Sequence, residues 1–113
     1  MNIQELGTIM QEKIDVKILI LNNNFLGMVR QWQELFFDKR YASTTMTNPD
    51  FLTIAKGYGI EGKRVDSRDN LESSLKEFLN HKGSFLLEVM VEKEGNVFPM
   101  VPTGASVSEV RLS

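Results

Sequence analysis

The sequence predicts an α/β fold with three layers, α/β/α, built around a mostly parallel sheet. Short apolar runs rich in β-branched residues alternate with segments in which apolar residues recur at helical spacing. The expected order is helix, strand, helix, helix, strand, helix, strand. This alternation implies βαβ units, whose strands run parallel and whose helices cover the faces of the sheet. The 113 residues amount to one domain.

The first half of the chain supplies two helices and one strand. Residues 2–13 place four apolar side chains on one helical face, with Asn2 as the expected N-cap: Ile3, Leu6, Ile9 and Met10. Residues 16–21, VKILIL, are nearly continuously apolar, which is typical of a strand covered on both faces. A helix is expected over 26–38, and a polar loop over 39–49.

The next elements begin at Pro49, which is suited to opening a helix. The segment DFLTIAKGYG, residues 50–59, places three apolar side chains together and ends in glycines: Phe51, Ile54 and Ala55. Residues 60–65, IEGKRV, predict a short strand.

The clearest helical pattern covers residues 66–83, with Asp66 or Ser67 as its cap and an apolar stripe of Leu71, Leu75, Phe78 and Leu79. Residues 84–91, SFLLEVMV, predict a second buried strand. The remaining segment has two of the three prolines and no clear period, so an irregular tail is expected.

Composition excludes several classes of function. The net charge of -2 and the absence of a Lys/Arg cluster argue against nucleic acid or an anionic membrane as a partner. The chain has no cysteine, which excludes disulfides, thiol catalysis and cysteine metal sites. The start MNIQELGTIM lacks the features of a signal peptide, and no apolar run reaches membrane-spanning length, so the cytoplasm is the expected location.

No catalytic residue is expected within the chain. Its one histidine, His81, stands beside Lys82 and Gly83, where a cation suits a helix C-terminus. Without a cysteine, a self-contained nucleophile and base are hard to assemble. Any chemistry must therefore use a cofactor or another part of a protein.

The organisation suggests that a piece is missing upstream. Three strands make a narrow sheet, and the predicted order opens with a helix that has no strand before it. We therefore expect the chain to be the C-terminal part of a larger domain.

Three asparagines, Asn22 to Asn24, end the first predicted strand. Ligands of open α/β sheets gather at the carboxyl ends of strands, and amide and carbonyl oxygens suit Mg²⁺. Asparagine also tolerates the left-handed backbone of a simple turn, so both interpretations stay open. No acidic residue follows closely, because Asp38 lies a helix away. A carboxylate ligand would have to come from elsewhere.

The helix after this turn carries an apolar stripe, which could be core or the wall of a pocket. Its members recur at helical spacing: Phe25, Met28, Val29, Trp32, Leu35 and Phe36.

The segments LNNNFLGMVRQWQELFF and FPMVPTGAS closely resemble the C-terminal, cofactor-binding domain of the acetolactate synthase large-subunit family. The resemblance covers essentially the whole chain. The family's magnesium motif opens with Gly-Asp-Gly and closes with Asn-Asn, and this chain carries only the closing half, Asn22-Asn23. The resemblance implies that residues 1–92 are the C-terminal part of a thiamine-diphosphate-binding domain without its Gly-Asp-Gly half, and that 93–113 are an irregular tail.

The resemblance also implies residue roles. The side chain of Asn23 and the backbone carbonyl of Phe25 would bind Mg²⁺. Gly27 and Met28 would contact the cofactor, and Met28 and Trp32 would line the substrate site. On this basis Met28 and Trp32 are expected to form pocket wall, whereas the side of the helix that carries Val29, Leu35 and Phe36 is expected to be core.

The implied enzyme is a transferase that decarboxylates pyruvate and joins the product to a second 2-oxo acid, in branched-chain amino acid biosynthesis. It would need thiamine diphosphate and Mg²⁺, with FAD bound outside this chain. Its expected partners are the remainder of the catalytic subunit, a second catalytic subunit and, as an open alternative, a small regulatory subunit. The chain alone should be inactive. Glyoxylate carboligase, pyruvate oxidase and a non-catalytic flavodoxin-like module are the alternatives.

Overall fold

The computed structural model describes residues 2–112, which form two compact units. Unit 1 contains the chain up to Asn23 together with Thr47–Val91. Unit 2 contains Asn24–Met46 and the chain from Glu92 onward. Each unit has its own network of contacts.

Unit 1 is built on a parallel sheet of three strands. Strands β1 (Lys17–Asn22), β2 (Glu61–Val65) and β3 (Phe85–Met90) lie in the order β1-β3-β2. The long apolar run of β3 suits its central place, because a central parallel strand is buried on both faces. The predicted strands and their parallel direction are confirmed.

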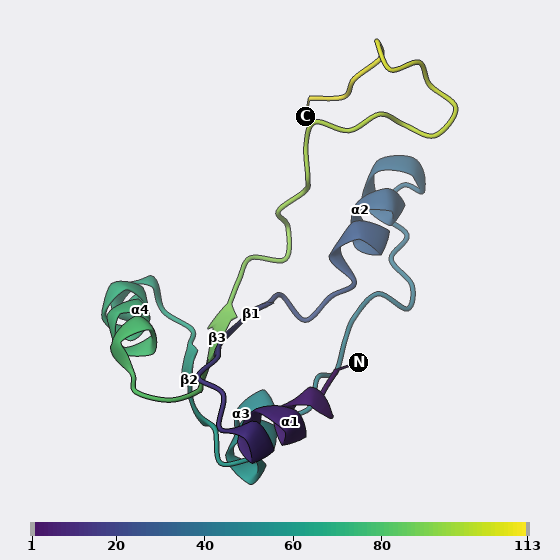
Figure 1. Ribbon diagram of the computed structural model, residues 1–113. Coiled ribbons are helices and arrows are strands. Elements are labelled where there is room, and N and C mark those ends of the chain that lie inside the picture. The colour runs from purple at the N-terminus through teal and green to yellow at the C-terminus, as the bar shows by residue number, and fades with distance from the viewer. Residues whose placement is uncertain (1, 113) are drawn as a thin grey trace. The chain divides into compact units, whose positions relative to one another are not determined.

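Helices cover both faces of this sheet (Figure 1). Helices α1 (Glu5–Glu12) and α3 (Phe51–Gly57) pack on one face. Helix α4 (Leu71–Asn80), preceded by the short 3-10 helix η1 (Arg68–Asn70), packs on the other. The three-layer α/β/α architecture is therefore confirmed.

Two apolar clusters form the core, one on each face of the sheet. The first consists of Ala55, Ile60 and Leu86, against which Leu6, Ile9, Ile18 and Ile20 pack. The second consists of Val65, Phe78, Phe85 and Leu87, against which Leu71, Leu75 and Val89 pack. Alternate residues of β3 thus serve opposite clusters, as the two-residue period of a strand requires.

The helix caps differ in part from those expected. The side chain of Asp50 accepts hydrogen bonds from the amides of Leu52 and Thr53, so Asp50 is the N-cap of α3, and the helix begins at Phe51 and not at Pro49. The bond from the Thr53 amide lowers the pKa of Asp50. Ser67 caps η1 as expected. The expected cap at Asn2 is wrong, because α1 begins three residues later at Glu5.

Several residues expected in the core are exposed. Leu19 and Leu21 of β1 point to the face covered by α4, but α4 packs mainly over β3 and β2, so these two side chains of the edge strand are exposed. Met10 of α1 and Leu79 of α4 are also exposed, as is Ile3, which lies in the turn before α1. The prediction that β1 is covered on both faces is therefore wrong for the described chain.

Unit 2 is organised around helix α2 (Gly27–Phe36). The chain before and after this helix pairs in an antiparallel bridge between Phe25 and Thr45, with Thr44 buried beside it. In the tail, Met100 and Arg111 form a second antiparallel bridge, which closes the segment between them into a loop. The rest of the described tail, up to residue 112, contains turns and bends but no helix or strand.

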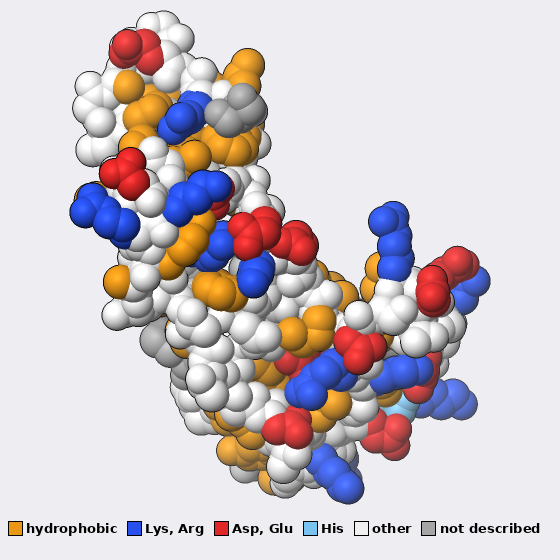
Figure 2. All heavy atoms as spheres, turned by 180° about the vertical axis from the view of Figure 1, so that it is seen from behind, with side chains coloured by type: hydrophobic (Ala, Val, Ile, Leu, Met, Phe, Trp, Pro, Cys, Tyr) orange, Lys and Arg blue, Asp and Glu red, His pale blue; other side chains and the backbone are white. Residues whose placement is uncertain are grey.

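The described surface carries both charged and apolar side chains. On the face shown in Figure 2, Lys and Arg are interspersed with Asp and Glu, and apolar side chains reach the surface between them. No helix among residues 2–112 is both long and apolar enough to cross a membrane.

The close packing of α3 on β2 requires a glycine at position 62. A Cβ atom there would lie 2.8 Å from the backbone oxygen of Leu86 and 3.0 Å from a methyl group of Leu52. We expect Gly62→Ala to lower the free energy of unfolding by roughly 1–3 kcal/mol through overpacking, measured by urea denaturation. Gly57→Ala is the matched control, because a Cβ atom at Gly57 meets nothing within 4 Å. Equal stabilities of the two variants would contradict this packing.

Candidate functional site at the asparagine turn and helix α2

The asparagine turn follows β1 directly, at the carboxyl end of the sheet. Asn22 is the last residue of β1 and is buried, and Asn23 is half-buried. Asn24 has a left-handed backbone with φ of 57°, which asparagine adopts more readily than most residues. The turn interpretation is confirmed at this residue. The turn does not exclude ligand binding, because the turn depends on the backbone of Asn24, whereas a ligand would bind the side chain of Asn23.

A buried carboxylate holds the start of this turn. Glu88 of β3 is 1% exposed and accepts a hydrogen bond from Asn22 Nδ2 at 2.7 Å. Its other oxygen accepts from Arg64 Nε, also at 2.7 Å. Asn22 Oδ1 in turn accepts from Asn48 Nδ2 at 3.0 Å, and Arg64 lies 3.6 Å from Asp50. All three strands and two loop residues of unit 1 therefore share one polar network.

Glu88 is a residue that the sequence interpretation missed. Its signal was a single acid in the otherwise apolar run FLLEVM, because a buried carboxylate is rare unless it is paired. The Glu88 carboxylate raises the pKa of Arg64, mainly through their hydrogen bond, so the guanidinium keeps its charge. The pair therefore carries no net charge beside the turn.

Two predicted pocket residues, Met28 and Trp32, are on the surface of unit 2. Their side chains are 56% and 41% exposed. Trp32 meets Phe36 edge to face, with ring centroids 5.8 Å apart. These two rings and Thr103 of the tail line a hollow of about 220 Å³. Trp32 is thus placed on the wall of a small hollow, whereas Met28 does not line it.

The prediction that one side of α2 forms part of the core is wrong for the described chain. Val29 and Phe36 are exposed and Leu35 is only half-buried. The buried residues of α2 are instead Arg30 and Gln31, at 6% and 2% exposure. The reason is that unit 2 packs through polar contacts to the tail, which cover the polar side of the helix.

Arg30 is the centre of these polar contacts. Its guanidinium lies over the rings of Tyr41 and Phe25, 4.3 and 5.2 Å from their centroids. Both terminal oxygens of Glu94 accept from Nη2, at 2.9 and 3.0 Å, and Glu34 lies 3.5 Å away. The cation is therefore buried with partners on the helix, the following loop and the tail.

The remaining predicted residues lie where the chain enters α2. Gly27 is the first residue of the helix. Phe25 is half-buried and bridges to Thr45 through its backbone. Asn23 belongs to unit 1, whereas Phe25, Gly27, Met28 and Trp32 all belong to unit 2.

The donor set at the turn fits a magnesium ion in part. Amide and carbonyl oxygens are suitable hard ligands, but Mg²⁺ in proteins normally also takes one or two carboxylates. Both oxygens of Glu88, the carboxylate bonded to Asn22, already accept hydrogen bonds. Among residues 2–112 no three His, Cys, Asp or Glu side chains are placed to hold a metal ion. The turn can therefore supply neutral oxygen ligands to a cation, but it does not supply a negative charge to balance the charge of the cation.

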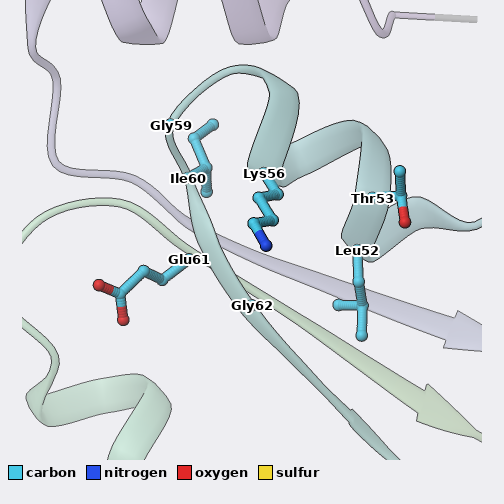
Figure 3. Close-up of a pocket in the computed structure, with 7 residues that line it drawn as sticks. All are labelled: Leu52, Thr53, Lys56, Gly59, Ile60, Glu61 and Gly62. Atoms are coloured by element: carbon cyan, nitrogen blue, oxygen red, sulfur yellow. The ribbon is translucent and has the colours of Figure 1, made fainter.

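A separate hollow of about 430 Å³ lies in unit 1 between α3 and β2. Figure 3 shows the side chain of Lys56 extending from α3 toward β2, while Glu61 points away from α3. The hollow holds none of the predicted site residues: it is lined by Leu52, Thr53, Lys56, Gly59, Ile60, Glu61 and Gly62. With one cation and no facing acid, it offers no catalytic arrangement.

The Glu88 network should dominate the stability of the strand ends. We expect Glu88→Ala to lower the free energy of unfolding by about 3 kcal/mol or more, because it leaves Asn22 and Arg64 without their shared acceptor. Glu77→Ala is the control, since it removes an exposed partner of Lys63 at 2.7 Å, worth about 1 kcal/mol or less. Similar losses in the two variants, measured by urea denaturation, would contradict the special role of Glu88.

Most of the chain matches known proteins. Residues 1–89 match the family described as "Thiamine pyrophosphate enzyme, C-terminal TPP binding domain". Thiamine pyrophosphate (TPP) is another name for thiamine diphosphate. The chain is 50% identical over 111 residues to the acetolactate synthase isozyme 2 large subunit of Escherichia coli K12, covering 97% of this chain and 20% of that protein.

Other relatives agree. The chain is 47% identical over 108 residues to the mitochondrial acetolactate synthase of Schizosaccharomyces pombe, covering 96% of this chain and 16% of that protein. A solved structure, the thiamine diphosphate-dependent 4-hydroxybenzoylformate decarboxylase of Rhodococcus jostii RHA1, superposes with a TM-score of 0.68 at 29% identity. It covers 79% of this chain, which matches 17% of the decarboxylase. The chain thus spans a fifth or less of the length of these relatives, and it belongs to the family of C-terminal TPP-binding domains of thiamine pyrophosphate enzymes.

Proposed function

We propose that this chain is the C-terminal, cofactor-binding part of an acetolactate synthase catalytic subunit. The proposed reaction decarboxylates pyruvate and joins the product to a second 2-oxo acid, as a step toward branched-chain amino acids. The similarity of almost the whole chain to acetolactate synthases at 42–50% identity carries this proposal. No observation favours a glyoxylate carboligase, a pyruvate oxidase or a flavodoxin-like module instead.

Asn23 and Phe25 are the proposed magnesium ligands, through a side-chain oxygen and a backbone carbonyl. Gly27 and Met28 are proposed to contact the cofactor. The neutral oxygens at the turn and the exposed apolar side chain of Met28 suit these roles. When bound, thiamine pyrophosphate supplies the electron sink that allows a 2-oxo acid to lose carbon dioxide. The protein then has to bind, orient and exclude water.

Trp32 is proposed to contact the substrate. Its indole shares a hollow with Phe36 and Thr103, and none of these three residues can act as a strong acid or base near neutral pH. This wall can therefore hold an apolar group and exclude water, but it cannot move the protons of the reaction. Proton transfer is assigned to the cofactor and to residues outside this chain.

Further partners are proposed on the same similarity. They are the remainder of the catalytic subunit, a second catalytic subunit and FAD bound outside this chain, with a small regulatory subunit as an open alternative. The cytoplasmic location expected from the sequence stays a prediction, because two of the relatives are named mitochondrial.

A chimera tests the proposed function. The matching 111-residue segment of the Escherichia coli isozyme 2 large subunit would be replaced by this chain. We expect the chimera to form acetolactate from pyruvate with Mg²⁺ and thiamine pyrophosphate, and Asn23→Ala to lower its cofactor affinity by roughly tenfold or more. Asn80→Ala, at the end of α4, is the matched control. A folded chimera that binds cofactor but forms another product would point to a sister enzyme instead.

The isolated chain should bind the cofactor weakly and be inactive. A dication and a diphosphate would meet only neutral oxygens at the turn, because the Glu88 carboxylate is already paired with Arg64. Calorimetry of the purified chain with Mg²⁺ and thiamine pyrophosphate is expected to show affinity far weaker than micromolar. Micromolar binding, or acetolactate formed above background, would show that the chain holds a more complete site than proposed.

A further inference from the structure

Helix α2 is held by its polar side chains, and two glutamines on either side of Trp32 do this in the same way. The side-chain amide of Gln31 donates to the backbone oxygen of Val97 at 3.0 Å and accepts from the Val97 amide at 2.8 Å. Gln31 Nε2 also lies 3.4 Å from the sulfur of Met100. One side chain thus pairs with both polar groups of a single backbone residue in the tail.

Gln33 repeats this arrangement with a different segment. It donates to the backbone oxygen of Ala42 at 2.9 Å and accepts from the Ala42 amide at 3.1 Å. A carboxamide is the side chain that offers a donor and an acceptor side by side in this geometry. We call these pairs, Gln31 with Val97 and Gln33 with Ala42, the two glutamine clamps.

The clamps differ in burial, which separates their contributions. Gln31 is almost completely buried, whereas Val97 is exposed and the two hydrogen bonds between them are partly buried, so water replaces the carboxamide of Gln31 less readily than that of an exposed residue. The Gln33 pair is exposed, so water can replace it. The first clamp ties α2 to the tail, and the second ties it to the loop that follows the helix.

Together the clamps, with Arg30, restrict the rotation of α2 about its own axis. Successive residues of an α-helix point about 100° apart, so Gln31 and Gln33 face different sides of the helix, and Trp32 faces the direction between them. Arg30 also ties the helix to Glu94 of the tail and stacks on Tyr41 of the loop. Two clamps to separate segments hold the indole toward the hollow that it shares with Phe36 and Thr103.

We propose that Gln31 and Gln33 are positioning residues that present Trp32 to this hollow. A role of Trp32 in binding substrate rests on the proposed function. The clamps do not depend on that function, because they are hydrogen bonds of the structure. Sequence periodicity could not reveal them, because it treats these glutamines as the solvated side of an amphipathic helix.

The test uses Trp32 as a probe, since it is the one tryptophan of the 113-residue chain. Gln31→Leu and Gln33→Leu remove one clamp each. Gln11→Leu is the control, because the side chain of Gln11 pairs only with its exposed neighbour Glu12. Amide exchange is followed by NMR, and the environment of Trp32 by its emission and its quenching by acrylamide. No cofactor or substrate is added.

Gln31→Leu is expected to speed exchange of the Val97 amide by roughly tenfold and to raise the emission wavelength and the quenching of Trp32. Gln33→Leu should do the same for the Ala42 amide and Trp32, and Gln11→Leu should change neither. If Gln31→Leu does not fold by circular dichroism, the exposed Gln33 clamp decides. Faster exchange with an unchanged Trp32 signal would overturn the positioning role, and unchanged exchange would overturn the clamp. An inactive chimera with intact clamps would count against the proposed function alone.

Discussion

The buried carboxylate of Glu88 joins the three strands of unit 1 at the end where the asparagine turn begins. It accepts from Asn22 on β1 and Arg64 on β2 while standing on the central strand. Because a buried charge is tolerated only when it is paired, these bonds hold the side chains of Asn22 and Arg64 toward the central strand. Asn23, the proposed magnesium ligand, is the next residue in the chain after Asn22, which this network holds.

The burial pattern of helix α2 in unit 2 is the reverse of that of an ordinary surface helix, which buries its apolar side. Helix α2 buries Arg30 and Gln31 and exposes Met28, Val29 and Trp32. Packing through a stacked guanidinium and paired carboxamides leaves the apolar side of the helix available to bind something else. Such an arrangement has little value as a core, but it suits a segment that presents an apolar wall to a ligand or to another part of a larger enzyme.

The sequence predicted the strands, the helices and their parallel arrangement, because hydrophobic periodicity reports directly on local structure. It could not predict that Val29 and Phe36 would be exposed, since a period shows which side of a helix is apolar and not what covers it. Glu88 and Gln31 were also missed, because their partners lie more than twenty residues away in the chain. Gln33 was missed because it looks like a solvated polar residue of the helix. The predicted roles of Asn23, Phe25, Gly27, Met28 and Trp32 came from the family resemblance and stay predictions.

The most direct test of the account asks whether a divalent cation with thiamine pyrophosphate binds at the asparagine turn. Mn²⁺ can replace Mg²⁺ at oxygen ligands, and it broadens the NMR signals of nearby groups even when binding is weak. With Mn²⁺ and thiamine pyrophosphate added to the chain, we expect selective loss of the Asn23 side-chain amide signal, while that of Asn80 persists. Broadening confined to exposed carboxylates such as Glu72, with Asn23 unchanged, would contradict the assignment of the turn as the metal end of the site.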